Sequence, residues 1–153
     1  MSEEQNIEQA KEHFGELINE QLDRIEKMKQ QKEFINYDEL KPIILGTVGG
    51  DGIGPVITAN AQKVLEFLLQ DEIQSGKIKF KEIKDLTIEN RAQQGQAIPD
   101  DILEEIKKCH VILKGPTTTP RAGDKWPNIE SANVAMRKEL DLFANMRPVK
   151  VPE

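Results

Sequence analysis

Short apolar runs alternate with amphipathic stretches in the central part of the chain, and this alternation constrains the fold more than any other feature. Three runs have the apolar or alternating pattern of β-strands, at 43–48, 78–83 and 110–114. Helical patterns separate them, the first extending to about residue 70 and the second covering 101–108. Strands that alternate with helices predict an α/β fold with a mainly parallel sheet flanked by helices.

Residues 1–36 have a different pattern and predict an amphipathic N-terminal helix, ahead of a globular part at 42–153. Its apolar side chains recur at three- and four-residue spacings, at Ile7, Phe14, Leu17, Ile18, Leu22, Ile25 and Met28. Ser2 is a candidate N-cap. Gly15 interrupts the short stripe and disfavours a long coiled coil. The helix either packs on its own domain or forms a dimer contact.

The chain of 153 residues has a net charge of −6, which disfavours nucleic acid or an anionic membrane as its main partner. No apolar run approaches the ~18 residues of a membrane span, and no signal-peptide pattern is present. These features predict a cytoplasmic protein. The single cysteine, Cys109, excludes an internal disulfide, and its place at the start of an apolar strand favours a buried structural role.

A glycine-rich turn at 49–55 follows the first strand, with Gly50, Gly52 and Gly54 at alternate positions. A dinucleotide fingerprint needs Gly-x-Gly-x-x-Gly, so this spacing does not fit, and no Walker loop is present. A strand-to-helix turn that requires positive φ is the better interpretation.

The stretch from Lys114 to Arg147 contains the candidate binding residues. Lys114 ends an apolar strand, where open α/β sheets place their ligands. A helix is predicted from about Ser131 until Arg147-Pro148 stops it. Ser131 and Asn133 would lie at its N-terminus, which favours anions, and Arg137 one turn further on the same face. Together with Arg147, these groups suit a ligand with several carboxylates.

Three motifs in this order resemble the isocitrate and isopropylmalate dehydrogenase family. They are Gly-Asp-Gly-Ile-Gly-Pro at 50–55, Leu-Lys-Gly-Pro-Thr-Thr-Thr-Pro at 113–120, and Ser-Ala-Asn-Val-Ala-Met-Arg at 131–137 with Leu-Phe-Ala-Asn-Met-Arg-Pro at 142–148. The resemblance implies a non-Rossmann α/β fold, here partial and with an extra N-terminal helix. It also implies NAD or NADP as cofactor, Mg²⁺ or Mn²⁺, and assembly into dimers or larger oligomers.

The resemblance also implies roles for individual residues. It assigns substrate binding to Thr119, Ser131, Asn133, Arg137 and Arg147, and cofactor binding to Lys114, Thr118 and Thr119. By this resemblance Ser131 and Asn133 favour isocitrate, a small tricarboxylate of the tricarboxylic acid cycle, because isopropylmalate enzymes usually have apolar residues there. Homoisocitrate and isopropylmalate-type substrates remain the alternatives.

Residues that the family needs for metal binding and proton transfer are not found near these motifs. We therefore expect no catalytic residue and no metal ligand within this chain, and no turnover of isocitrate to 2-oxoglutarate by the chain alone. As the N-terminal substrate-binding part of such an oxidoreductase, it would need a C-terminal part. Either the sequence is a fragment of a longer chain that contains this part, or a separate chain supplies it. A homo-oligomer and a non-catalytic regulatory or binding subunit remain alternatives.

Overall fold

The computed structural model describes residues 3–30 and 35–150. Contacts within the chain divide it into two units, Met1–Asp38 and Glu39–Glu153. In the first unit, α1 (Glu3–Gln30) is one helix of 28 residues. Lys27 and Lys29 lie in its last turn, where positive charge complements the helix dipole. Of the rest of the range predicted as helix, 1–36, the Ser2 cap and residues 31–34 lie outside the described residues, and residues 35–36 are not helical.

The second unit contains a three-stranded parallel sheet, as the sequence predicts. Its strands are β1 (Ile43–Val48), β2 (Ile78–Ile83) and β3 (Val111–Lys114), in the order β2-β1-β3. Leu45 in the central strand stands opposite Phe80 on one side and Val111 on the other. Because all three strands are parallel, their carboxyl ends meet at one edge of the sheet, which is where the candidate motifs begin.

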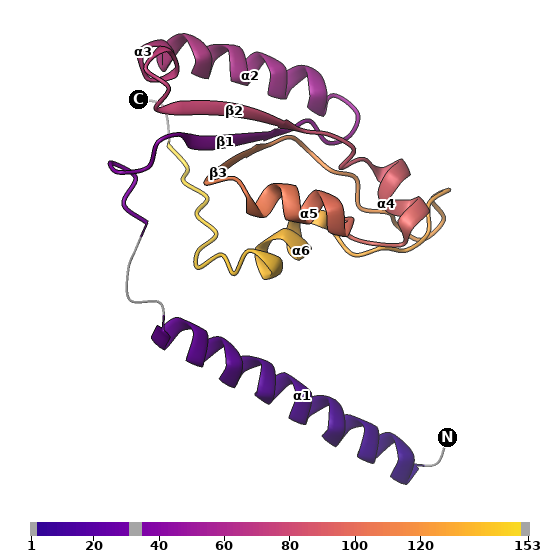
Figure 1. The fold of residues 1–153 in the computed structure, drawn as a ribbon. Helices are drawn as coiled ribbons and strands as arrows, with labels where there is room; N and C mark the ends of the chain where they lie inside the picture. Colours follow the sequence, from indigo (N-terminus) through magenta and orange to yellow (C-terminus); the bar gives the residue numbers. More distant parts are fainter. Residues whose placement is uncertain (1–2, 31–34, 151–153) are drawn as a thin grey trace. The chain divides into compact units, whose positions relative to one another are not determined.

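Helices cover both faces of this sheet (Figure 1). One face carries α2 (Gly54–Leu68) and α3 (Gln70–Gln74), and the other carries α5 (Asp100–Lys107) and α6 (Ala132–Glu139). The short α4 (Ile88–Gln94) lies beyond the carboxyl ends of the strands. Pro55 stands in the first turn of α2, a position where its missing N–H costs no hydrogen bond.

The core of the second unit lies between the sheet and the layer of α5 and α6. It contains Val48, Ile83, Leu86, Ile98, Ile102, Leu103, Ile106, Ala132, Ala135 and Met136. Cys109 is partly buried against this core, and its Sγ donates to the carbonyl oxygen of Glu105 at 3.4 Å. Burial raises the pKa of the Cys109 thiol, which opposes thiolate formation and agrees with a structural role.

Three features of the fold differ from the sequence prediction. The short helices α3 and α4 were not predicted, because five and seven residues are too few to show an apolar period. The helix expected to reach Arg147 ends at Glu139, so its predicted length is wrong. Asp141 has φ +48, outside the helical range, and Phe143 is 99% exposed. Leu140 packs partly against the core, but Leu142 and Phe143 are exposed, so no packing stabilises further helical turns.

Candidate functional site

The glycine turn after β1 packs against the loop that follows β3. The Gly115 N–H donates to the Val48 carbonyl at 2.7 Å, and the Asp51 N–H donates to the Pro116 carbonyl at 2.8 Å. Gly50 has φ +72, and a Cβ there would lie 2.0 Å from the Pro116 oxygen. The turn is glycine-rich because two backbone segments approach closely, which agrees with the structural interpretation of its spacing.

Thr118, a predicted cofactor contact, has both of its backbone polar groups bound by charged side chains. Its N–H donates to Oδ2 of Asp51 at 2.6 Å, and its carbonyl accepts from Nη1 of Arg91 at 2.7 Å. The other oxygen of Asp51 accepts from the Ile88 N–H at 2.7 Å, at the start of α4. Charge-assisted hydrogen bonds are stronger than neutral ones, so the 115–120 loop has a fixed backbone at this point.

Arg91 connects this loop to the start of α6. Its side chain is fully buried, with Nε donating to the Ala97 carbonyl at 2.7 Å and Nη2 to the Glu130 carbonyl at 2.9 Å. Burial lowers the pKa of Arg91, while the Asp51 carboxylate raises it. In the described part of the chain no buried polar side-chain atom lacks a hydrogen-bond partner. One guanidinium thus holds the backbone beside Thr118 and beside Ser131, two predicted site residues.

Sequence reasoning missed Arg91 because it overlooked α4. A local signal was present: the Thr87 hydroxyl accepts from the Asn90 N–H at 3.4 Å, and Gly95 ends the helix with φ +65. Thr at an N-cap and Gly at C′ mark a short helix even without an apolar stripe. An arginine inside such a helix is ordinarily exposed, and only the fold identifies the three carbonyls that bury this one.

Lys114 is the last residue of β3 and is half-buried beneath the same loop. Its Nζ donates to the Gly115 carbonyl at 2.9 Å and to Oγ1 of Thr117 at 3.0 Å. Burial, with a smaller contribution from the positive charge of Arg91, lowers the pKa of Lys114 to about 8, against the opposing effect of Asp51. Two cations and one anion therefore lie together at this strand end, which favours an anionic ligand.

Helix α6 presents two predicted site residues on its outer side. Ala132, Ala135 and Met136 are buried in the core, whereas Asn133 and Arg137 are exposed and one turn apart. Ser131 is the N-cap residue, with φ −62 and ψ 125, and its hydroxyl makes no capping hydrogen bond. The polar side chains at the start of this helix therefore point away from its buried face.

The remaining predicted residues are exposed. Thr119 follows Thr118 in the fixed loop, and Arg147 lies in a non-helical, exposed segment after α6. In the described part of the chain, no hydrogen bond or ion pair joins Arg147 to another predicted site residue. Asp51 and Arg91 thus connect Thr118 with Glu130, the residue before Ser131, and the charge of Lys114 lies close enough to interact with both. Among the described residues, no hydrogen bond or ion pair joins Thr119, Asn133, Arg137 or Arg147 to this network.

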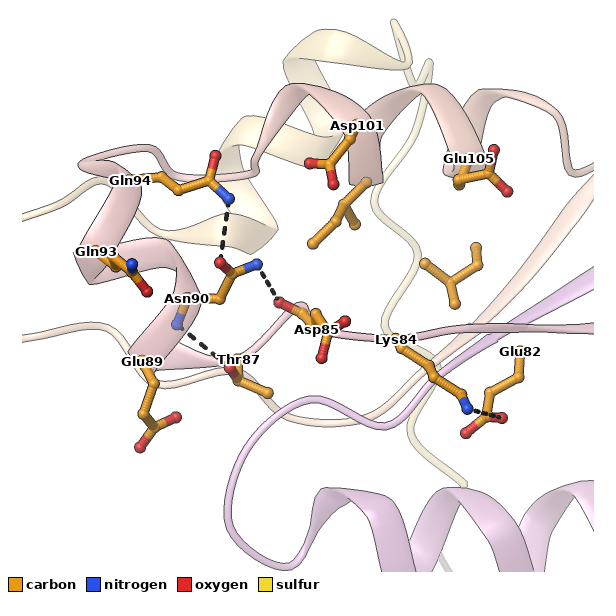
Figure 2. Close-up of a pocket in the computed structure, with 12 residues that line it drawn as sticks. Glu82, Lys84, Asp85, Thr87, Glu89, Asn90, Gln93, Gln94, Asp101 and Glu105 are labelled. Atoms are coloured by element: carbon orange, nitrogen blue, oxygen red, sulfur yellow. Dashed lines mark hydrogen bonds and ion pairs between the residues drawn. The ribbon is translucent and has the colours of Figure 1, made fainter.

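A hollow of about 710 Å³ between β2, α4 and α5 is chemically different from this network (Figure 2). Carboxylates dominate its lining, namely Glu82, Asp85, Glu89, Asp101 and Glu105. None of the predicted site residues lines it. Hydrogen bonds from Lys108 and Lys81 lower the pKa of Glu105 to about 2, so this carboxylate is ionised at neutral pH. A ligand with several carboxylates would be repelled here.

The predicted divalent metal finds no site among residues 3–30 and 35–150, where no three His, Cys, Asp or Glu side chains are grouped to hold one. The assigned site residues are Lys, Thr, Ser, Asn and Arg, which do not form the carboxylate set that Mg²⁺ prefers. Among the described residues, no helix is both long and apolar enough to cross a membrane.

Comparison with known proteins agrees with the motifs. The model of the isocitrate/isopropylmalate dehydrogenase family matches residues 44–153. An isocitrate dehydrogenase [NADP] of Staphylococcus epidermidis is 39% identical over 127 residues, covering 82% of this chain and 28% of the relative. Another from Caldococcus noboribetus is 40% identical over 112 residues, covering 71% of this chain and 24% of the relative.

A homoisocitrate dehydrogenase of Methanocaldococcus jannaschii is 33% identical over 102 residues, covering 67% of this chain and 27% of the relative. The chain spans about a quarter of the length of these curated relatives. The glycine turn, the loop after β3 and α6 all lie within the matched residues. From its motifs, its parallel α/β fold and these matches, the chain belongs to the isocitrate/isopropylmalate dehydrogenase family.

Proposed function

We propose that this chain forms the substrate-binding N-terminal part of an oxidoreductase that converts isocitrate to 2-oxoglutarate with NADP. The observation that carries the proposal is the Asp51–Arg91 network, which fixes Thr118 and the residue before Ser131 in one rigid frame. Relatives named isocitrate dehydrogenase [NADP] support the choice of substrate and cofactor.

The carboxylates of isocitrate would be bound from α6 and from the segment after it. Asn133 and Arg137 are exposed one turn apart on the helix, and Ser131 precedes its first residue. A guanidinium can bind a carboxylate with two parallel hydrogen bonds, and the free N–H groups at a helix start favour negative charge. Arg147 would add a second guanidinium.

On the cofactor side, Lys114, Thr118 and Thr119 would lie next to the bound dinucleotide. The Thr118 backbone is already bound on both sides, so its side chain is presented from a fixed position. Such preorganisation lowers the ordering cost of binding. Positive potential from Lys114 and Arg91 would favour a phosphate-bearing ligand.

We assign no metal-dependent step to this chain, because its described residues provide no group of metal ligands. Other residues would supply the ligands of Mg²⁺ or Mn²⁺, the proton-transfer groups and the rest of the cofactor site. On this proposal the chain binds and orients the substrate. The reaction takes place only when these other residues are present, either in a longer chain that forms a homo-oligomer or in a separate chain.

Isothermal titration calorimetry of the purified chain with isocitrate tests the proposal, after circular dichroism has confirmed folding. We expect binding that weakens by about tenfold to a hundredfold in Arg137→Ala, because a charge-assisted hydrogen bond to carboxylate contributes about 1.5–3 kcal/mol. Lys138→Ala is the matched control, since Lys138 is an exposed neighbour whose amine pairs with Glu130 at 2.7 Å.

Parallel titrations with homoisocitrate and isopropylmalate test the substrate. Stronger binding of either would contradict isocitrate as the preferred ligand. A folded chain that binds none of the three would contradict a preformed recognition site. Binding of isocitrate without activity, even after a completing C-terminal chain is added, would instead indicate a regulatory subunit.

A further inference from the structure

Helix α1 has an apolar stripe that no other described residue of its own unit covers. Its seven large apolar side chains, Ile7, Phe14, Leu17, Ile18, Leu22, Ile25 and Met28, are between 43% and 64% exposed. At 100° per residue they fall within an arc of about 140°, and apart from Gly15 the rest of the circumference carries polar residues. The helix also lies outside residues 44–153, which match the family. The motifs that carry the proposed carboxylate site therefore do not include it.

A 28-residue helix with such a stripe requires a partner surface. Isolated helices are only marginally stable in water, and most helical stability comes from packing an apolar face. A 3-4-3 spacing occurs twice in α1, at Ile7, Ala10, Phe14 and Leu17, and again at Ile18, Gln21, Ile25 and Met28. This is the spacing by which helices pack against one another in coiled coils.

We propose that α1 pairs with α1 of a second copy of this chain, with the two helices antiparallel. The two runs of four are mirror images about the point between Leu17 and Ile18. In an antiparallel pair centred there, Ile7 of one copy lies opposite Met28 of the other, and Ala10 opposite Ile25. Each pair of opposing residues in this contact then includes at least one apolar side chain from the stripe.

The charge distribution favours the antiparallel arrangement. Residues 3–16 contain five glutamates and one lysine, a net charge of −4, whereas residues 17–30 contain three acidic and three basic residues, a net charge of zero. A parallel pair would align the two −4 halves, but an antiparallel pair places each beside a neutral half that contains Lys27 and Lys29. The two helix dipoles also oppose each other favourably in this orientation.

The area available fits a weak but specific dimer. Fully burying an Ile, Leu, Phe or Met side chain removes about 60–120 Å² of apolar surface from water, judged from its transfer free energy. Fourteen such side chains in the pair would bury on the order of 1,000 Å², the lower end of biological interfaces. Dimerisation should therefore depend on protein concentration.

Sedimentation equilibrium of the full 153-residue chain at several concentrations tests the proposal. We expect a reversible monomer–dimer equilibrium, and a monomer at every concentration for the triple variant Phe14→Gln, Ile18→Gln, Ile25→Gln. A matched triple variant on the polar face, Gln9→Ala, Asn19→Ala and Gln30→Ala, should dimerise like the parent. Circular dichroism and urea unfolding check that unit 2 remains folded in each variant.

Several outcomes would overturn the proposal. A parent chain that stays monomeric would show that the stripe does not bind a second copy. A dimer that survives the Phe14, Ile18 and Ile25 changes, but is lost in Val64→Gln with Phe67→Gln, would place the contact on the exposed side of α2 instead.

Disulfide trapping tests the orientation of the helices in a Cys109→Ser background. An antiparallel pair predicts that Ile7→Cys and Met28→Cys chains cross-link when mixed, and that neither cross-links with itself. Self-cross-linking of Ile7→Cys chains would indicate a parallel pair and contradict the inference. Isocitrate affinity should be unchanged throughout, so this test and the test of the carboxylate site can fail independently.

Discussion

Two stretches of the family-matched region carry predicted ligand residues but are held in different ways. In the 115–120 loop, both backbone groups of Thr118 bind charged side chains, and the Gly115 N–H is paired with β1. In the 141–150 segment every residue is exposed, including Arg147, and the backbone is not helical. Both stretches match the same family, so they differ in how far the rest of the fold holds their backbone in place.

The comparison teaches that recognition residues and the residues that position them are different sets. Thr118 is exposed, yet its backbone geometry is fixed by the partly buried Asp51 and the fully buried Arg91. Arg147 has no such support from the described residues. We infer that the loop side of the site is preorganised, and that Arg147 takes up its binding geometry through contacts with ligand or partner.

The largest expected effect comes from removing the cation that supports the loop. Arg91→Met keeps an unbranched side chain but leaves the carbonyls of Ala97, Thr118 and Glu130 without their donor. Breaking a buried charged network in this way costs about 3–5 kcal/mol. Urea unfolding followed by circular dichroism should show this loss in the free energy of unfolding.

Arg121→Met is the matched control, because Arg121 is exposed and should change the free energy of unfolding by less than about 0.5 kcal/mol. Arg91→Lys sharpens the test. Lysine retains the charge but not the planar fork, so its stability should lie between those of the parent and Arg91→Met. Equal stability of the parent and Arg91→Met would refute the supporting role of the guanidinium.

The next effect should come from the anion of the same network. Asp51→Asn keeps one acceptor oxygen but turns an NH₂ group toward one of two backbone donors, the N–H of Ile88 or of Thr118. We expect a loss of about 1.5–3 kcal/mol, the value of a hydrogen bond to a charged group. Asp124→Asn is the control, because its exposed carboxylate also accepts a backbone N–H, from Arg121 at 2.8 Å.

The sequence predicts the framework of this region well and its supporting network poorly. The three parallel strands and α5 follow from local apolar patterns, which burial in a common core enforces. Family motifs supply the candidate ligand residues. Arg91 escaped notice because an arginine in a short polar helix is ordinarily exposed, and its burial depends on carbonyls up to 39 residues away.

The same reasoning explains the overlong final helix. Leu140 and Phe143 continue an approximate helical spacing, but periodicity shows only which residues could share a face. Whether a core exists to receive that face is a tertiary property. Here the core ends near Leu140, which is only partly buried against it, and the chain leaves the helix at Asp141.

A moderate effect of pH is expected from Lys114, beneath the fixed loop. Burial lowers its pKa from 10.5 to about 8 in the folded chain. Below pH 8 both states hold the proton, and the folded state bears the cost of the buried charge. Between pH 8 and 10.5 the unfolded state holds more protons, so stability rises with pH. Since the amine is partly exposed, we expect the free energy of unfolding to rise by about 1 kcal/mol over this pH interval.

Urea unfolding at pH 7.5, 8.5 and 9.5 isolates this contribution when the parent is compared with Lys114→Met. The difference in free energy of unfolding between the two chains should shift in favour of the parent as pH increases. Lys84→Met, at an exposed lysine, should show no such shift. An identical pH dependence for the parent and Lys114→Met would mean that Lys114 titrates as an ordinary exposed lysine.

The smallest effect is expected in the unsupported segment. Phe143→Ser removes a large apolar side chain that is 99% exposed, so the free energy of unfolding should change by less than about 0.5 kcal/mol. Met136, seven residues earlier and 8% exposed in the core, provides the comparison: Met136→Ala should cost about 2–5 kcal/mol in the same urea experiment. If Phe143→Ser were as destabilising as Met136→Ala, the 141–150 segment would have to pack against the fold, and the contrast with the loop would be wrong.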